Sequence, residues 1–71
     1  MTNYEKAESA QLGKLIADKI VEIKTKYPEL RVGQIIGNAL PVNQNDPYYY
    51  PDKDLFQSLC TCLDMYNDGI R

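Results

Sequence analysis

One apolar stripe in the first third of the chain constrains the fold more than any other feature. Its members follow the repeat of one face of an α-helix: Leu12, Leu15, Ile16, Ile20, Ile23 and Tyr27. Pro28 disfavours a helical backbone at the residue before it, so we expect the helix to end there. Thr2 and Glu5 have the spacing of a helix-capping box. The pattern therefore predicts a helix over residues 3–27, about 36 Å long.

A second, shorter helix is predicted over residues 29–40. Its apolar residues again have helical spacing: Val32, Ile35, Ile36, Ala39 and Leu40. Pro28 or Glu29 would form its first turn, where a proline is tolerated. Gly33 and Gly37 lie four residues apart, and this spacing favours close approach of another backbone, although both could simply be tolerated in a short helix. Gly13 in the first helix has the same two interpretations.

The third helix is predicted over residues 52–67. Its apolar face consists of Leu55, Phe56, Leu59, Leu63 and Tyr66. Asp52 is a favourable N-cap, and Asp54 lies in the first turn, where the helix dipole favours acids. Asn67, Asp68 and Gly69 form a stop, because a glycine suits the position just after a helix. The chain is therefore expected to be one all-α, three-helix domain over residues 1–71.

The first helix is too long for the short second helix to cover it. Either the third helix runs antiparallel along it, or another chain covers part of its apolar stripe. A chain of 71 residues also has a small core, which contributes only about 3–5 kcal/mol of net stability. Tyr4, Ala7 and Val21 on the first helix are available for a contact with another chain. We therefore expect at least a weak homodimer.

Residues 41–51 form the only long connection, an ordered loop that ends in three tyrosines between two prolines. Tyr48, Tyr49 and Tyr50 are the best candidates for a contact surface, because tyrosine buries a large area at a low entropic cost. In an extended loop, neighbouring side chains point to opposite sides. We therefore expect one or two of them in the core and at least one on the surface. Both a structural role and a role at an interface are open.

Arg31 and Gln34 are the other candidate residues, either for holding the loop or for contacting a partner. A cation at the start of the second helix opposes the helix dipole, so Arg31 is expected to have its own partner. Asp46, Asp52 and Asp54 are candidates for an intrachain ion pair, and a contact with another protein is the alternative. Gln34 could bond to loop backbone and hold the loop against the helix.

The residues for catalysis and metal binding are missing. The chain contains no histidine, so a serine or cysteine nucleophile would lack its usual base. The acids around the loop lack the glycine and the closing glutamate of an EF-hand. Cys60 and Cys62 are too few for a thiolate metal site and, on a helix, point about 200° apart, which would strain a disulfide. We expect reduced thiols, no enzymatic activity and no cofactor or metal.

The charge of the chain argues against nucleic acid as its main partner. It carries 8 basic and 10 acidic residues, whereas a phosphate-binding domain has a basic face. A nucleic-acid-associated regulator that uses the first helix is the alternative, because that helix carries Lys6, Lys14, Lys19, Lys24 and Lys26. We find neither a secretory signal nor a membrane-spanning stretch of about 20 apolar residues. With reduced cysteines, this predicts a cytoplasmic protein.

Residues 27–56 carry a recognisable pattern. It consists of Pro28-Glu29-Leu30-Arg31, then Gly33-Gln34-Ile35-Ile36 and, after the loop, Asp46-Pro47-Tyr48-Tyr49. The pattern resembles that of a family of small, uncharacterised bacterial and bacteriophage proteins. The resemblance implies a small helical fold in a bacterial or phage cytosol and brings no catalytic residues. Because many phage proteins of this size modulate a host protein, we expect a non-enzymatic protein-interaction module.

Overall fold

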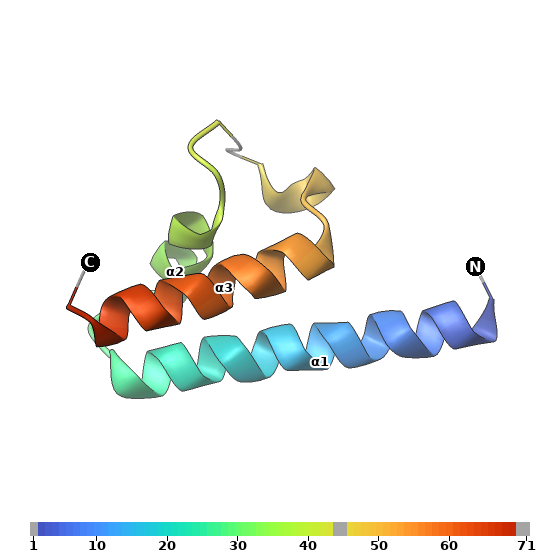
Figure 1. Cartoon of the computed structure of the whole chain (residues 1–71), viewed down its shortest axis with the longest axis horizontal. Helices are drawn as coiled ribbons and strands as arrows, with labels where there is room; N and C mark the ends of the chain where they lie inside the picture. The colour runs from blue at the N-terminus through green and yellow to red at the C-terminus, as the bar shows by residue number, and fades with distance from the viewer. Residues whose placement is uncertain (1, 44–45, 70–71) are drawn as a thin grey trace.

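The computed structural model describes residues 2–43 and 46–69. In this part of the chain it contains the helices α1 (Asn3–Lys26), α2 (Val32–Ala39) and α3 (Asp52–Asn67), the short 3-10 helix η1 (Pro47–Tyr49), and no strand. α1 and α3 lie side by side, and α2 packs against both (Figure 1). The prediction of a small all-α fold with a long first helix and a third helix after a loop is confirmed.

Local sequence explains where α1 begins and ends. The Thr2 hydroxyl caps its N-terminus by accepting a hydrogen bond of 3.1 Å from a backbone N–H one turn along. The helix ends at Lys26, two residues before Pro28 and one residue before the predicted end. At this end the Lys24 ammonium donates to the carbonyl oxygens of Pro28, at 3.0 Å, and of Leu30, at 2.6 Å. Lys24 therefore holds the turn that follows the helix.

The second helix begins later than predicted. Residues 27–30 form a turn, in which the N–H of Leu30 donates to the carbonyl of Tyr27 at 3.0 Å. α2 then starts at Val32, with Arg31 as its N-cap residue. Pro28 therefore ends α1 but does not start α2, because the residues after it are used to redirect the chain.

α3 spans the residues predicted for it. Its N-cap residue is Pro51, and Asp52 takes the first helical position instead of the predicted cap. At the other end, Gly69 has a φ of 85°, and its N–H donates to the carbonyl of Tyr66 at 3.0 Å. Side chains rarely adopt this left-handed backbone, so the glycine after the helix is the predicted stop.

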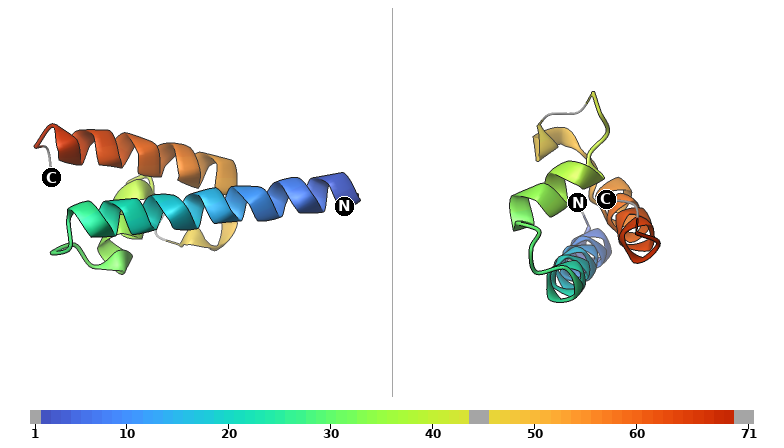
Figure 2. Two further views of the ribbon diagram at one scale, coloured as in Figure 1. Left: turned by 90° about the horizontal axis from the view of Figure 1, so that it is seen from below. Right: turned by 90° about the vertical axis from the view of Figure 1, so that its left-hand side faces the viewer.

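α1 and α3 run in the same direction, so the first of the two alternatives, an antiparallel third helix, is wrong. Leu12 in the first half of α1 lines the same hollow as Phe56 near the start of α3. At the opposite end, the rings of Tyr27 and Tyr66 pack edge to face with centroids 5.6 Å apart. Residues 27–51, which include α2, are long enough to return the chain to the level at which α3 begins (Figure 2). The first turns of α1 extend beyond the start of α3 (Figure 1).

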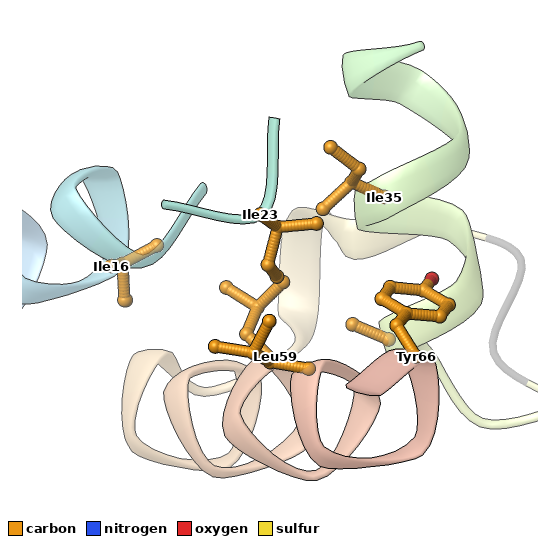
Figure 3. Packing of buried hydrophobic residues seen from close by; sticks show 7 residues of the cluster. Ile16, Ile23, Ile35, Leu59 and Tyr66 are labelled. Carbon is orange, nitrogen blue, oxygen red and sulfur yellow. The ribbon is translucent and has the colours of Figure 1, made fainter. Parts of the chain in front are cut away.

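The core lies where the three helices meet. Ile23 of α1, Ile35 of α2 and Leu59 of α3 are fully buried, and their side chains lie close together (Figure 3). The other buried members of the cluster are Ile16, Ala39, Leu63 and Tyr66. Burying a side chain such as isoleucine or leucine contributes about 1.5–3 kcal/mol, so each of these residues is important to the stability of so small a chain.

The glycines do not mark close helix contacts. A Cβ atom placed on Gly13, Gly33 or Gly37 would have no neighbouring atom within 4 Å. The predicted close approach of another backbone is therefore wrong for this chain. These glycines face open space, and their effect on α1 and α2 is to lower helix propensity.

Candidate functional site

The tyrosine segment is a single turn of 3-10 helix, not an extended loop. The carboxylate of Asp46 accepts a hydrogen bond of 2.9 Å from the N–H of Tyr48 and so caps this turn. Pro47 occupies the first position, where its fixed φ suits a helix and its missing N–H costs nothing. The N–H of Tyr50 then donates to the carbonyl of Pro47 at 3.1 Å. The expectation that neighbouring tyrosines alternate between two sides is therefore wrong.

Tyr48 and Tyr49 both point to the surface. Their side chains are 80% and 79% exposed, respectively. The two rings nevertheless pack against each other edge to face, with centroids 4.7 Å apart and an angle of 73° between the ring planes. Such an arrangement is favourable for aromatic quadrupoles, so the two rings are held in a defined relation while remaining open to a partner.

Tyr50 turns the other way, towards α3. It is half-buried, and its hydroxyl lies 3.2 Å from that of Ser58, within hydrogen-bonding distance. An open groove of about 440 Å³ begins beneath it, between α2 and α3. Side chains of mixed character line it, chiefly Asn38, Asp54, Gln57, Thr61 and Met65. We call Tyr48, Tyr49 and this groove the tyrosine surface.

Gln34 contacts Arg31 through the backbone of Arg31 and not through the charge of its side chain. The side-chain oxygen of Gln34 accepts a hydrogen bond of 2.8 Å from the N–H of Arg31. Gln34 thus bonds to backbone, as expected. The backbone that it holds belongs to the turn before its own helix and not to the 41–51 loop. The ion pairs among the described residues do not include Arg31, so the predicted pairing with Asp46, Asp52 or Asp54 is not seen. Arg31 is exposed and does not line the groove of the tyrosine surface.

A small polar network that we did not predict joins α2 to α3. The side-chain amide of Asn38 donates to the hydroxyl of Tyr66 at 3.0 Å, and the thiol of Cys62 lies 3.5 Å from the Asn38 carbonyl. Burial raises the pKa of the Cys62 thiol and so favours its neutral form. A polar asparagine within the apolar second helix was the only available sign of this network. Cys60 and Cys62 are both free thiols, as expected.

Removing the hydroxyl of Tyr66 tests this network. We expect Tyr66→Phe to lower the free energy of unfolding by about 1 kcal/mol, the typical net value of one hydrogen bond. Urea unfolding followed by circular dichroism would measure the change. Tyr49→Phe is the matched control, because the exposed Tyr49 hydroxyl forms no contact with α2, and it should leave the midpoint unchanged. Equal midpoints for both variants would contradict a stabilising role for the network.

The lysines of α1 are largely engaged within the chain. Lys14 pairs with Asp18 at 3.1 Å, and Lys19 pairs with Glu22 at 3.0 Å. The hydrogen bond to Glu22 raises the pKa of Lys19 and so favours its charged form. Lys26 lies 3.9 Å from Glu22, and Lys24 bonds to backbone carbonyls. These contacts reduce the positive charge that α1 offers to a partner.

Two classes of site are not found in residues 2–43 and 46–69. No three residues of the types His, Cys, Asp and Glu are grouped so that they could hold a metal ion. No described helix is both long enough and apolar enough to cross a membrane.

Comparison with known proteins adds no relative. No protein-family model, no curated protein and no solved structure matches the chain. The resemblance of residues 27–56 therefore stays a prediction.

Proposed function

We propose that this chain is a cytoplasmic, non-enzymatic interaction module that binds a protein partner through the tyrosine surface. The supporting observation is the pair Tyr48 and Tyr49, which are almost four-fifths exposed and yet packed against each other. Aromatic side chains that are already ordered lose little entropy on binding and are enriched among the residues that dominate binding energy. The groove beside them provides space for a side chain of the partner.

The partner segment is expected to carry a lysine or arginine. Asp54 is the charged residue in the lining of the groove, and it has no ion pair among the described residues. Residues 28–71 also carry six acids against three bases. A cation of the partner that enters the groove would therefore meet complementary charge at Asp54. The resemblance of residues 27–56 makes a bacterial host protein the first partner to seek.

Paired captures would test the tyrosine surface. Wild type, Tyr48→Ala/Tyr49→Ala and Tyr4→Ala would each be immobilised and exposed to bacterial lysate, and retained proteins would be identified by mass spectrometry. Tyr4 is the matched control, because it is 77% exposed but lies in the first turn of α1. We expect a protein that wild type and Tyr4→Ala retain and the double variant loses, with affinity reduced at least tenfold, or about 1.4 kcal/mol. The same retained proteins on all three would contradict the proposal.

A charge reversal would test the chemistry of that partner. Asp54→Lys is expected to weaken its binding, whereas Asp52→Lys should not. Both variants replace an acid in the first turn of α3, so both oppose the helix dipole to a similar extent. Asp52 lines a different hollow, beside the start of α1. Equal affinities of the two variants for the captured protein would show that Asp54 does not face the partner.

The alternative, a nucleic-acid-associated regulator that uses α1, has less support. Four of its five lysines, all except Lys6, are bonded to Asp18, to Glu22 or to backbone carbonyls. Phosphate binding would have to displace these partners, and α3 beside it is acidic.

A further inference from the structure

The first turns of α1 have little cover from the rest of the described chain, and residues 2–11 are all exposed. α1 has 24 residues and α3 has 16, so at 1.5 Å per residue the two differ in length by about 12 Å. Because both end at the same level, the difference falls at the N-terminal end (Figure 1). A few helical turns with so little tertiary packing are only marginally stable in water. This end of α1 would therefore gain from a covering element.

An apolar hollow and a projecting ring lie on the same side of this segment. The hollow has a volume of about 350 Å³, and its apolar walls are Leu12, Leu15 and Phe56. Leu15 is 43% exposed, and Tyr4 is 77% exposed. Tyr4 and Leu15 are separated by three turns of helix, so they share a face about 16 Å apart. One copy of the chain thus carries both a projecting side chain and a hollow that it cannot fill itself.

Both signs of charge border this hollow. Glu8 and Lys53 line it, and neither forms an ion pair among the described residues. A two-fold symmetric interface uses the same patch on both copies, so the patch must be complementary to itself. This patch meets that requirement in two ways. It carries both the ring of Tyr4 and a hollow that could receive it, and both an anion, Glu8, and a cation, Lys53. A partner of a single charge sign would leave one of the two ions unmatched.

We propose that this face binds a second copy of the chain, with the two α1 helices antiparallel. A two-fold axis between residues 9 and 10 places Tyr4 of each copy level with Leu15 of the other, at the hollow. The same axis places Glu8 of each copy near Lys53 of the other. The contact covers the first turns of both α1 helices. This surface is separate from the tyrosine surface, because none of the residues that line the hollow also lines the groove, and η1 lies away from α1, beyond α3, in the view of Figure 1.

Sedimentation equilibrium of the full chain from about 1 to 500 µM spans the range of weak association and tests the proposal. We expect the wild-type mass to rise from monomer towards dimer. Tyr4→Glu and Leu15→Glu should each weaken association at least tenfold while far-UV circular dichroism shows a folded monomer. Val21→Glu is the matched control, because Val21 is 62% exposed on another face of α1, and it should dimerise like wild type.

A charge exchange tests the orientation. Lys53→Glu should weaken the dimer, and Glu8→Lys combined with Lys53→Glu should restore it. A wild-type mass that stays monomeric throughout would overturn the proposal. A dimer that Val21→Glu disrupts and Tyr4→Glu leaves intact would overturn it as well. Because Tyr48 and Tyr49 play no part here, either result leaves the proposed function standing on its own test.

Discussion

Ile23→Ala is expected to remove most of the stability of the domain, so that a large fraction of the protein is unfolded at 25 °C. Ile23 is fully buried and lies between Ile35 and Leu59, so its truncation removes packing from all three helices at once (Figure 3). Replacing a buried isoleucine with alanine costs about 2–5 kcal/mol, and a core of this size supplies only about 3–5 kcal/mol in total. The loss is therefore comparable with the entire stability of the domain.

Thermal and urea unfolding, followed by circular dichroism, would measure this effect. The matched control is Val21→Ala, two residues away on the same helix and 62% exposed. Substitutions at such surface positions change stability by no more than about 0.5 kcal/mol. A wild-type midpoint for Ile23→Ala would mean that the three helices do not converge on this residue. Because a dimer would add concentration-dependent stability, both variants should be compared at one protein concentration.

The second large effect has the opposite sign. Replacing Gly13, Gly33 and Gly37 together with alanine is expected to raise the free energy of unfolding by about 1.5–3 kcal/mol. Each alanine gains about 0.5–1 kcal/mol over glycine inside a helix, and the added Cβ atoms would meet no neighbour within 4 Å. For so small a domain, this increase could amount to half of its stability.

Gly69→Ala is the control for this triple variant. Its φ of 85° is a conformation that side chains rarely adopt, so we expect a loss of roughly 1 kcal/mol instead of a gain. Urea midpoints would measure both changes. If the triple variant were less stable than wild type, another backbone would have to approach these glycines, as in a complex. Stability measured with increasing protein concentration would then identify self-association as the cause.

The helices were predictable because each depends on signals within a few residues. Periodicity is the signal in the stripe from Leu12 to Tyr27. Local backbone preference is the signal at the proline at 28 and the glycine at 69. Their consequences appear in the structure within one to three residues of the predicted boundaries. The direction of α3 was not predictable in this way. The direction of α3 depends on the path of residues 27–51 between α1 and α3. The turns in this segment have no periodic sequence pattern from which the path could be predicted.

The candidate site was only partly predictable. Composition alone singled out the three tyrosines, but their orientation follows from the cap that Asp46 forms and the single turn that begins at Pro47. The role expected of Arg31 depended on the charge of its side chain. In the structure its backbone N–H is the group that bonds to Gln34. The bond between Asn38 and Tyr66 joins residues 28 positions apart, and local pattern cannot reveal such a contact.

The shared direction of α1 and α3 also bears on the order in which the chain folds. The bond between Tyr27 and Asn67 closes a loop of 40 residues, whereas Ile23 and Ile35 are only a dozen residues apart in the core. Closing the longer loop costs about 1 kcal/mol more in chain entropy. We therefore expect α1 and α2 to pair first and α3 to dock onto that pair. α2, the shortest of the three α-helices, would then complete the template on which the long-range contacts of α3 form.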